Sequence, residues 1–218
     1  MKQQQSIQPL QVDIVSDVVC PWCIIGYLQL QKALAGLPGY FDVTIAWHPF
    51  ELNPQMPEAG QDLREHVAQK YGSSAADSQS MRTRMSALGE SLGFTFDYFE
   101  GMRMVNTFRA HQLLYWAAEQ GRQTELKLAL FEAFFSRRED VNDASVLLEV
   151  VSRVGLEAAA AKAVLDDTRY AQPVREEEQL WLEREVHAVP TLVFAQQYIV
   201  PGAQEAEAFT RLLQKIHA

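Results

Sequence analysis

The feature that most constrains this chain is the run Cys20-Pro21-Trp22-Cys23, which contains both cysteines of its 218 residues. The run follows a segment rich in valine and isoleucine and precedes apolar residues at helical spacing, so it marks a turn from a strand into a helix. A Cys-x-x-Cys pair can be a dithiol, a disulfide or half of a metal site. A structural zinc site normally needs a second pair of ligands, whereas the five histidines are scattered singly. Redox chemistry is therefore favoured over metal binding, and over two inert buried thiols.

The helix start gives the two cysteines different expected roles. Cys20 falls at the N-cap, where free backbone N–H groups and the helix dipole favour a negative charge. Pro21 falls at the first helical position, where its missing N–H costs nothing. We therefore expect Cys20 to be the ionised, attacking thiol, and Cys23, one turn further in, to be shielded and to resolve the mixed disulfide. Because no charged or imidazole donor lies between them, we expect a less oxidising pair than a Pro-His dipeptide would give.

Composition and charge exclude several classes of protein. A hydrophobic content of 48% allows a substantial core. The net charge of −9 argues against nucleic acid as a partner. The chain contains no run of ~18 consecutive apolar residues, so we expect no membrane span. The glutamine-rich start, Met1 to Gln11, lacks the apolar run of a secretory signal, so we expect a cytoplasmic protein.

The order of the expected elements indicates an α/β fold. A strand, a helix and a second strand occupy the first fifty or so positions, and this order implies a parallel pair of strands. The chain ends with a helix, a hairpin and another helix, and the segment between the two halves is helical. The expected strands are Gln11–Val19, Phe41–Trp47, Thr191–Phe194 and Tyr198–Val200, and the expected helices are Trp22–Leu34, Asp62–Tyr71, Ser74–Leu92, Val105–Gln120, Thr124–Arg137, Ala144–Val154, Leu156–Leu165, Thr168–Glu185 and Glu205–His217.

The strands at the two ends of the chain need each other to form a sheet. A four-stranded mixed sheet with helices on both faces, interrupted by an all-helical insertion of roughly a hundred residues, buries every strand. This predicts a first part of the sheet domain at residues 1–52, the insertion at 53–167 and the second part at 168–218.

Several segments together resemble one family. The chain is similar to the DsbA superfamily, and within it to the FrnE-like branch, which is related to 2-hydroxychromene-2-carboxylate isomerases and kappa-class glutathione transferases. The segments that carry the resemblance span nearly the whole chain. They are Ser16-Asp17-Val18-Val19 before the cysteines, Gly26, Pro49-Phe50-Glu51-Leu52-Asn53-Pro54, Asn106-Thr107 with Ala110-His111, Ala188-Val189-Pro190-Thr191, and Pro201-Gly202-Ala203-Gln204.

The resemblance implies a thioredoxin fold with a large helical insertion and a thiol-disulfide oxidoreductase activity. It makes Cys20 the attacking thiol, Cys23 the resolving thiol and Pro190 a cis-proline that faces them. The Val189 backbone would then pair with an extended peptide or with glutathione. Protein or small-molecule disulfides and thiols are the implied partners, with no bound cofactor and with glutathione as a reductant or substrate. Pro21 and Trp22 complete the expected substrate-binding set.

Three further residues are candidates for accessory roles. Relatives often have glycine just before the proline, where this chain has His187-Ala188, so His187 is either an exposed loop residue or a group that stabilises a thiolate. Asn53 precedes Pro54 and marks a turn or contacts glutathione. Asn106, near Thr107 and His111, belongs to a polar cluster that closes the cleft.

A buried acid that takes the proton of the second cysteine is expected from the resemblance to thioredoxins. Asp13 and Asp17 are both near the motif in sequence, and both remain candidates.

Two other functions stay open at this point. The first is a glutathione-dependent isomerase or transferase, against which Cys23 counts, because such chemistry has no use for a resolving thiol. The second is a binding module or holdase whose cysteines only sense the redox state. The sequence predicts no oligomeric state.

Overall fold

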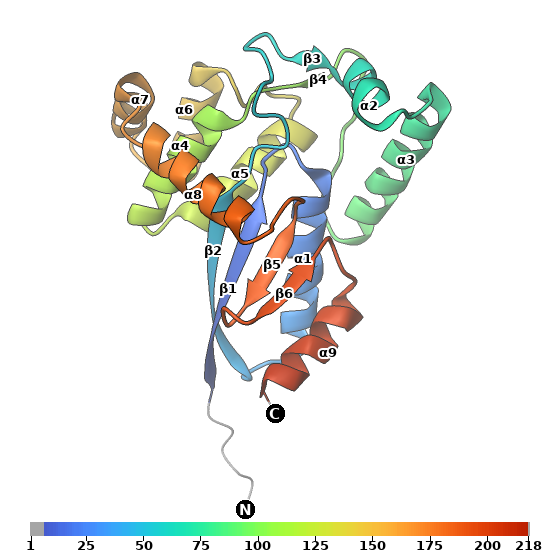
Figure 1. Cartoon of the computed structure of the whole chain (residues 1–218), viewed down its shortest axis with the longest axis vertical. Coiled ribbons are helices and arrows are strands. Elements are labelled where there is room, and N and C mark those ends of the chain that lie inside the picture. The colour runs from blue at the N-terminus through green and yellow to red at the C-terminus, as the bar shows by residue number, and fades with distance from the viewer. Residues whose placement is uncertain (1–6, 218) are drawn as a thin grey trace, which may run out of the picture.

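The computed structural model describes residues 7–217, and the first six residues of the glutamine-rich start lie outside the described part. Strand β1 (Gln8–Ser16) pairs in parallel with β2 (Phe41–Pro49), and helix α1 (Pro21–Ala35) connects them. On its other side β1 pairs antiparallel with β5 (Thr191–Phe194), and β6 (Tyr198–Pro201) completes the order β2-β1-β5-β6 (Figure 1). The predicted four-stranded mixed sheet is confirmed.

The end of the first strand differs from the prediction. β1 ends at Ser16, and Val18 and Val19 lie in the loop that leads to the dithiol. In that loop the Cys20 N–H donates to the Asp17 carbonyl oxygen at 3.2 Å, which closes a turn. The two valines are buried although they are not in a strand, and β-branched residues that are buried in a loop imitate a strand in the sequence pattern.

Alternate residues of β1 face two different layers of helix. Val12 and Ile14 belong to the main core, which they share with α1 and with α9 (Ala206–His217). Val15 faces the opposite side, where it packs with Trp181 of α8 (Ala171–Glu183). Figure 1 shows α8 in front of the sheet and α1 behind it. Helices therefore cover both faces, as predicted.

The segment between the two halves of the sheet carries most of the helices. Its elements are β3 (Gln61–Asp62), α2 (Leu63–Tyr71), α3 (Ala75–Ser91), β4 (Arg103–Met104), α4 (Phe108–Glu119), α5 (Gln123–Ser136), α6 (Ala144–Arg153) and α7 (Ala158–Asp167).

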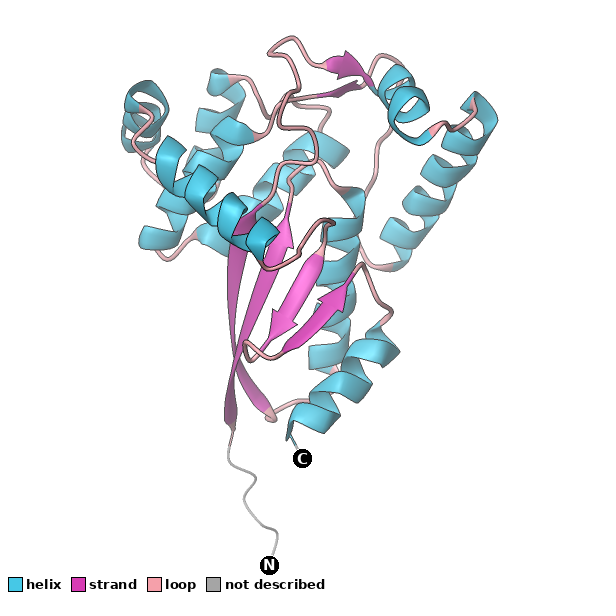
Figure 2. Ribbon diagram, in the orientation of Figure 1, coloured by secondary structure: helices cyan, strands magenta, loops and turns pink. Residues whose placement is uncertain are grey.

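The prediction of an all-helical insertion is wrong in one respect. β3 and β4 form a small antiparallel pair at the top of the molecule in Figure 2. Each strand has only two residues, which is too short for an alternating pattern to show in the sequence.

The insertion is fastened to the edge strand β2 by α5. The Gln123 side chain accepts from the Trp47 N–H at 2.9 Å and donates to the Trp47 carbonyl oxygen at 2.8 Å. This amide takes the place of a neighbouring strand at an otherwise unpaired edge. The Trp47 indole also donates to Thr124 at 3.0 Å. The contact brings the apolar face of α5 against the sheet and toward the start of α1.

In the part of the chain that the structure describes, none of the helices has the length and apolar content needed to span a bilayer.

Candidate active site

The dithiol lies at the end of the sheet that faces the insertion. Cys20 is the N-cap of α1, with φ −92° and ψ 110°, and Pro21 occupies the first turn. The Cys23 N–H donates to the Cys20 carbonyl oxygen at 3.1 Å, which places the two side chains one turn apart. Both cysteines are free thiols. Cys20 is 3% exposed and Cys23 is fully buried, so Cys20 is the one nearer to solvent.

The loop before β5 lies against Cys20. The Cys20 Sγ is 3.7 Å from the Val189 carbonyl oxygen, and the Val189–Pro190 peptide bond is cis. Gly26 allows this approach, because a Cβ at its position would lie 3.2 Å from the Pro190 Cγ. Trp22 is 41% exposed, so its indole presents an apolar surface next to the sulfur. These residues are the ones that the sequence predicts to bind substrate.

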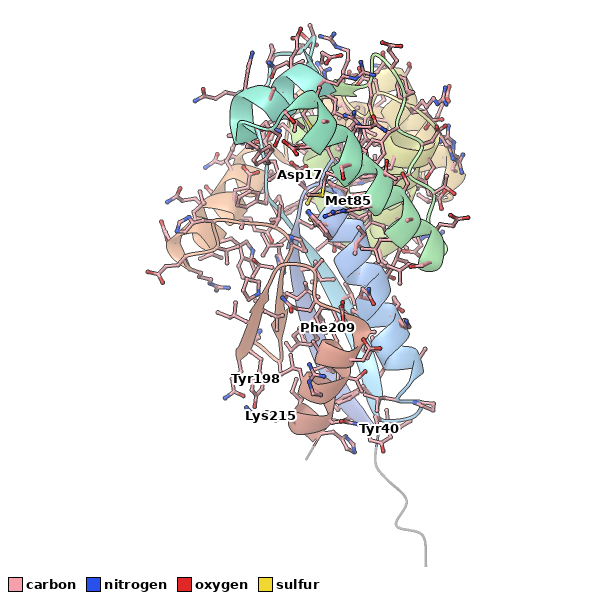
Figure 3. All side chains as sticks on the ribbon, turned by 90° about the vertical axis from the view of Figure 1, so that its right-hand side faces the viewer. Asp17, Tyr40, Met85, Tyr198, Phe209 and Lys215 are labelled. Atoms are coloured by element: carbon pink, nitrogen blue, oxygen red, sulfur yellow. The ribbon has the colours of Figure 1, made fainter. Side chains whose placement is uncertain are left out.

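Asp17 forms a buried ion pair behind the dithiol. Its Oδ2 accepts from the Leu52 N–H at 2.7 Å, and its Oδ1 lies 3.2 Å from His111 Nε2. Both side chains are 1% exposed. Burial alone would raise the pKa of Asp17, but the hydrogen bond and charge of His111 and the bond from Leu52 hold it below its ordinary value. Figure 3 shows Asp17 near the start of α1, well above Tyr40 and Lys215, which lie at the lower end of the molecule.

Lys127 of α5 is the second buried charged group in this region. Its side chain is fully buried, and its Nζ donates to the Ser16 carbonyl oxygen at 3.3 Å. The ammonium also lies 5.5 Å from the ring centroid of Trp47 and 5.2 Å from that of Phe131. Burial lowers its pKa to about 8, against the attraction of Cys23 and Asp17, which raises it. Burial and the neighbouring acidic groups thus act on the charge of Lys127 in opposite directions.

The two thiols ionise with different ease. Burial raises the pKa of Cys20 well above its ordinary value, and the hydrogen bond with Cys23 and the Asp17 carboxylate raise it further. Burial also opposes ionisation of Cys23, but hydrogen bonds from Cys20 and Ser16 and the charge of Lys127 lower its pKa. The Ser16 hydroxyl forms no hydrogen bond of ordinary geometry within residues 7–217, and the Cys20 thiol donates to the Val189 carbonyl oxygen, so the charge of Lys127 makes the firmer contribution.

The prediction that Cys20 is the ionised, attacking thiol stays a prediction. The helix N-terminus favours an anion at Cys20, and the buried ammonium of Lys127 attracts a negative charge on either sulfur, most strongly on Cys23.

The contacts of the three predicted accessory residues account for the structure of their loops more than for a role in the chemistry. His187 is exposed and forms no hydrogen bond or ion pair to another described residue. Asn53 accepts from the Lys70 ammonium at 2.7 Å. Asn106 donates to the Met56 carbonyl oxygen at 3.1 Å and accepts from the Phe108 N–H, which starts α4. The charges that act on the thiols come instead from Asp17 and Lys127.

Asp13, the other candidate for a buried acid, belongs to a different cluster. Its Oδ1 lies 2.9 Å from His48 Nε2, and His48 Nδ1 pairs with Glu177 of α8. Burial alone would lower the pKa of His48, but the hydrogen bonds and charges of the two carboxylates raise it. Of the two aspartates only Asp17 is placed beside the dithiol.

Lys127 is the residue that the sequence analysis did not single out. Lys127 shares one helical face with Leu130, Phe131 and Phe134. A lysine within this apolar stripe is the sequence feature that could have pointed to it. Nothing local indicates that this stripe faces two cysteines a hundred residues earlier.

No group of three or more His, Cys, Asp or Glu residues within residues 7–217 has a geometry suited to a metal ion.

The strand order, the dithiol at the start of α1 and the cis-proline loop opposite define a thioredoxin-fold protein with an inserted helical segment. The chain belongs to the DSBA-like thioredoxin domain family, whose model matches residues 11–214. The resemblance to the DsbA superfamily is thereby confirmed.

Known proteins agree with this placement. A probable DsbA oxidoreductase from Streptomyces coelicolor, SCO1869, is 33% identical, with a TM-score of 0.89 over 94% of this chain and 89% of that chain. The uncharacterized protein YwbO of Bacillus subtilis is 25% identical over 94% of this chain and 96% of its own length. The cytosolic disulfide reductase DsbM of Pseudomonas aeruginosa, solved with GSH, shares the fold at 16% identity, with a TM-score of 0.62 over 94% and 98% of the two chains.

Proposed function

We propose that this protein catalyses thiol-disulfide exchange through the dithiol of Cys20 and Cys23. The observation that carries the proposal is the position of the two thiols. Cys20 lies nearer to solvent, next to the exposed Trp22 indole, and Cys23 lies near the buried ammonium of Lys127. Only a thiolate attacks a disulfide, and the helix N-terminus and the buried ammonium of Lys127 both favour a negative charge on the pair.

The proposed steps use the two thiols in turn. The Cys20 thiolate attacks one sulfur of the substrate disulfide, and the first substrate thiolate leaves and takes up the proton that Cys20 released on ionising. Cys23 then loses its proton and attacks the Cys20 sulfur, which closes the ring and releases the second substrate thiolate, and that thiolate takes up the proton of Cys23. Two electrons pass to the substrate, and two thiols form from one disulfide. Run in reverse, the same steps oxidise a substrate, and the potential of the pair against its surroundings decides the direction.

The substrate would lie between Trp22 and the loop at Val189. An extended peptide or glutathione pairs with the Val189 backbone, and the indole covers the apolar part next to its sulfur. Protein or small-molecule disulfides are the substrates that fit this surface. The fold neighbour solved with GSH makes glutathione the first thiol to test, and its description as cytosolic supports a cytoplasmic setting.

The decisive experiment compares single-cysteine variants in a disulfide-reduction assay with insulin as substrate. Cys20→Ser is expected to lose activity by at least about a hundredfold, because its sulfur is the nucleophile. Cys23→Ser is expected to stop after the first step, as a mixed disulfide that mass spectrometry detects. Full turnover by Cys23→Ser would exclude a dithiol mechanism and favour a glutathione-dependent isomerase or transferase. Full turnover by Cys20→Ser would exclude the proposed function altogether.

A further inference from the structure

His48 on β2 is held between two carboxylates that the proposed mechanism does not use. Its Nε2 lies 2.9 Å from the Asp13 Oδ1 on β1, and its Nδ1 pairs with Glu177 on α8. A carboxylate only accepts hydrogen bonds, and a neutral imidazole donates from one nitrogen only. Both contacts are therefore hydrogen bonds only when the three groups hold one additional proton. Burial alone would lower the pKa of His48, but the two carboxylates raise it, so this proton lies on the ring.

These two contacts help to hold α8 on the sheet. The start of α8 is fixed separately, because Arg175 pairs with Glu51 in the loop after β2. Further along α8 the apolar contacts form a small cluster, whose buried members are Val15, Trp181, Val186 and Val193. The indole N–H of Trp181 is buried without an acceptor within residues 7–217, and an open hollow of about 500 Å³ lies beside it. An unpaired buried donor and a poorly filled contact both cost stability, so the position of this part of α8 depends on the bond between His48 and Glu177.

The same cluster borders the loop that lies against Cys20. Trp181 contacts the His48 ring, with the two ring centroids 4.7 Å apart. Figure 1 shows α8 in front of the sheet, with the chain running from its end to the start of β5. This segment, residues 184–190, is here called the Val189 loop. Val189 packs against both the main core and the small cluster, and its carbonyl oxygen lies 3.7 Å from the Cys20 Sγ. A movement of α8 on the sheet therefore reaches the backbone that would bind the substrate.

Loss of the proton from His48 removes one of its two hydrogen bonds. Asp13 is held on strand β1 and also accepts from the Gln11 side chain at 3.1 Å. The Glu177 side chain is 23% exposed, and its carboxylate has no other hydrogen bond within residues 7–217. A neutral ring therefore keeps its bond to Asp13, and Glu177 turns to water. The ring then no longer joins α8 to the sheet.

We propose that His48 is a positioning residue that fixes α8, and through it the Val189 loop, only while its ring is protonated. This inference rests on the proposed function for one consequence, that the binding of substrate at the loop weakens as the pH rises. Only the two carboxylates are hydrogen-bonded to the ring. The titratable and charged groups that face His48 are Asp13 from β1, Glu177 from α8 and Arg184 after it, and, across a narrow cavity of about 10 Å³, His111 and Tyr115 from α4 and Lys127 from α5.

The first test measures amide hydrogen exchange of the wild type by mass spectrometry at pH 6 and pH 9. Each rate is divided by that of an unstructured peptide at the same pH, which gives the protection of the segment. The protection of residues 171–190 is expected to fall severalfold at pH 9, because the ring loses its proton between the two pH values. The protection of α9, which belongs to the main core, should stay constant. Equal protection of residues 171–190 at the two pH values would overturn the proposal.

The second test compares two neighbouring glutamates of α8. Glu177→Gln replaces the carboxylate by an amide, which accepts from a protonated ring and donates to a neutral one. The protection of residues 171–190 should therefore no longer depend on pH in this variant. Glu176→Gln makes the same change at an exposed position that pairs with Gln172, so it should behave like the wild type. A pH dependence that persists in Glu177→Gln, or that is lost in Glu176→Gln, would overturn the proposal.

A third measurement separates positioning from the chemistry of the sulfurs. In single-turnover oxidation of the dithiol by oxidised glutathione, the concentration that half-saturates the rate should rise at least threefold from pH 6 to pH 9 in the wild type, relative to Glu177→Gln. The maximal rate should change with pH alike in both, because both contain the same thiols. An equal change of the half-saturating concentration in the two proteins would exclude the positioning role. Failure of the proposed function is distinguishable, because Cys20→Ser would then still reduce insulin, whereas hydrogen exchange reports on α8 and the Val189 loop whatever the cysteines do.

Discussion

Two aspartates near the start of the chain, Asp13 and Asp17, each pair with a histidine, and the two pairs differ in burial and in their other partners. The inner pair, Asp17 and His111, is 1% exposed on both sides and lies beside the dithiol. The outer pair, Asp13 and His48, is 14% and 18% exposed and shares a second carboxylate, that of Glu177. The hydrogen bonds of the inner pair lower the pKa of Asp17, and those of the outer pair raise the pKa of His48.

The difference shows how the surroundings decide what an ion pair does. Inside the protein a charge is tolerated only with a full set of partners, so Asp17 uses both oxygens, one on His111 and one on the Leu52 N–H. At the rim water supplies part of the solvation, so His48 can hold two carboxylates and still reach solvent. The inner pair is therefore suited to hold a fixed charge near the sulfurs, and the outer pair to exchange protons.

The largest expected effect is on the free energy of unfolding, and it differs between variants of the two aspartates. Asp17→Asn should lower the free energy of unfolding by about 3 kcal/mol or more, because it leaves a buried pair incomplete. Asp13→Asn should lower it by only about 1 kcal/mol, because that pair is partly solvated. Urea unfolding of both variants measures the two losses. If the two losses were equal, burial would not be what distinguishes the pairs.

A smaller effect concerns Lys127, which lines the same cavity as His111 and His48. In the disulfide form, Lys127→Met should raise the free energy of unfolding by about 1 kcal/mol, because a buried ammonium without a close anion is replaced by an apolar side chain of similar size. In the dithiol form the gain should be smaller, because the two thiols can ionise and attract the wild-type ammonium, whereas a disulfide cannot. Thermal unfolding of both redox forms measures this, with the exposed Lys162→Met as the control. A gain of the same size in the two forms would contradict the link between the lysine and the dithiol.

The smallest effect is the pH dependence of the outer pair. The pKa of His48 is raised on folding, so its pairing stabilises the protein fully below about pH 6.5, and the contribution is lost as the pH rises through the higher folded value. His48→Gln should therefore lower stability by about 1 kcal/mol at pH 6 and by less at pH 9. The pH dependence of the inner pair has the opposite sign. The pKa of Asp17 is lowered on folding, so its pairing stabilises the protein fully above about pH 3.9, and the contribution is lost as the pH falls through the lower folded value. Urea unfolding of wild type and His48→Gln at both pH values checks this, and a larger loss at pH 9 would refute it.

Much of the fold was predictable because its signs are local. The Cys20-Pro21 helix start, the alternation from Phe41 to Trp47 and the hairpin after Thr191 each depend on neighbouring residues. The errors arose where burial imitated another element, as with Val18 and Val19 in a loop, or where the strands were too short to show a pattern, as in β3 and β4. The cysteines and the proline loop were predictable from the motif and the resemblance.

The charges around the sulfurs were not predictable in the same way. The helix N-terminus favours an anion at Cys20, but the buried ammonium that also acts on the pair comes from a distant segment of the chain. Asp17 was one of two candidates, and the neighbouring sequence does not distinguish it from Asp13. The Leu52 N–H, His111 and Lys127 that complete the site come from three separate segments.

The sequence by itself determined the strand-to-helix turn that presents the two thiols, because backbone geometry and capping depend on residues next to each other. Only the tertiary structure decided which charged groups surround the two sulfurs. Long-range packing brings Lys127 from the insertion to the inner sulfur, and the energy of a charge inside a protein depends on distances in space that no spacing along the chain reveals.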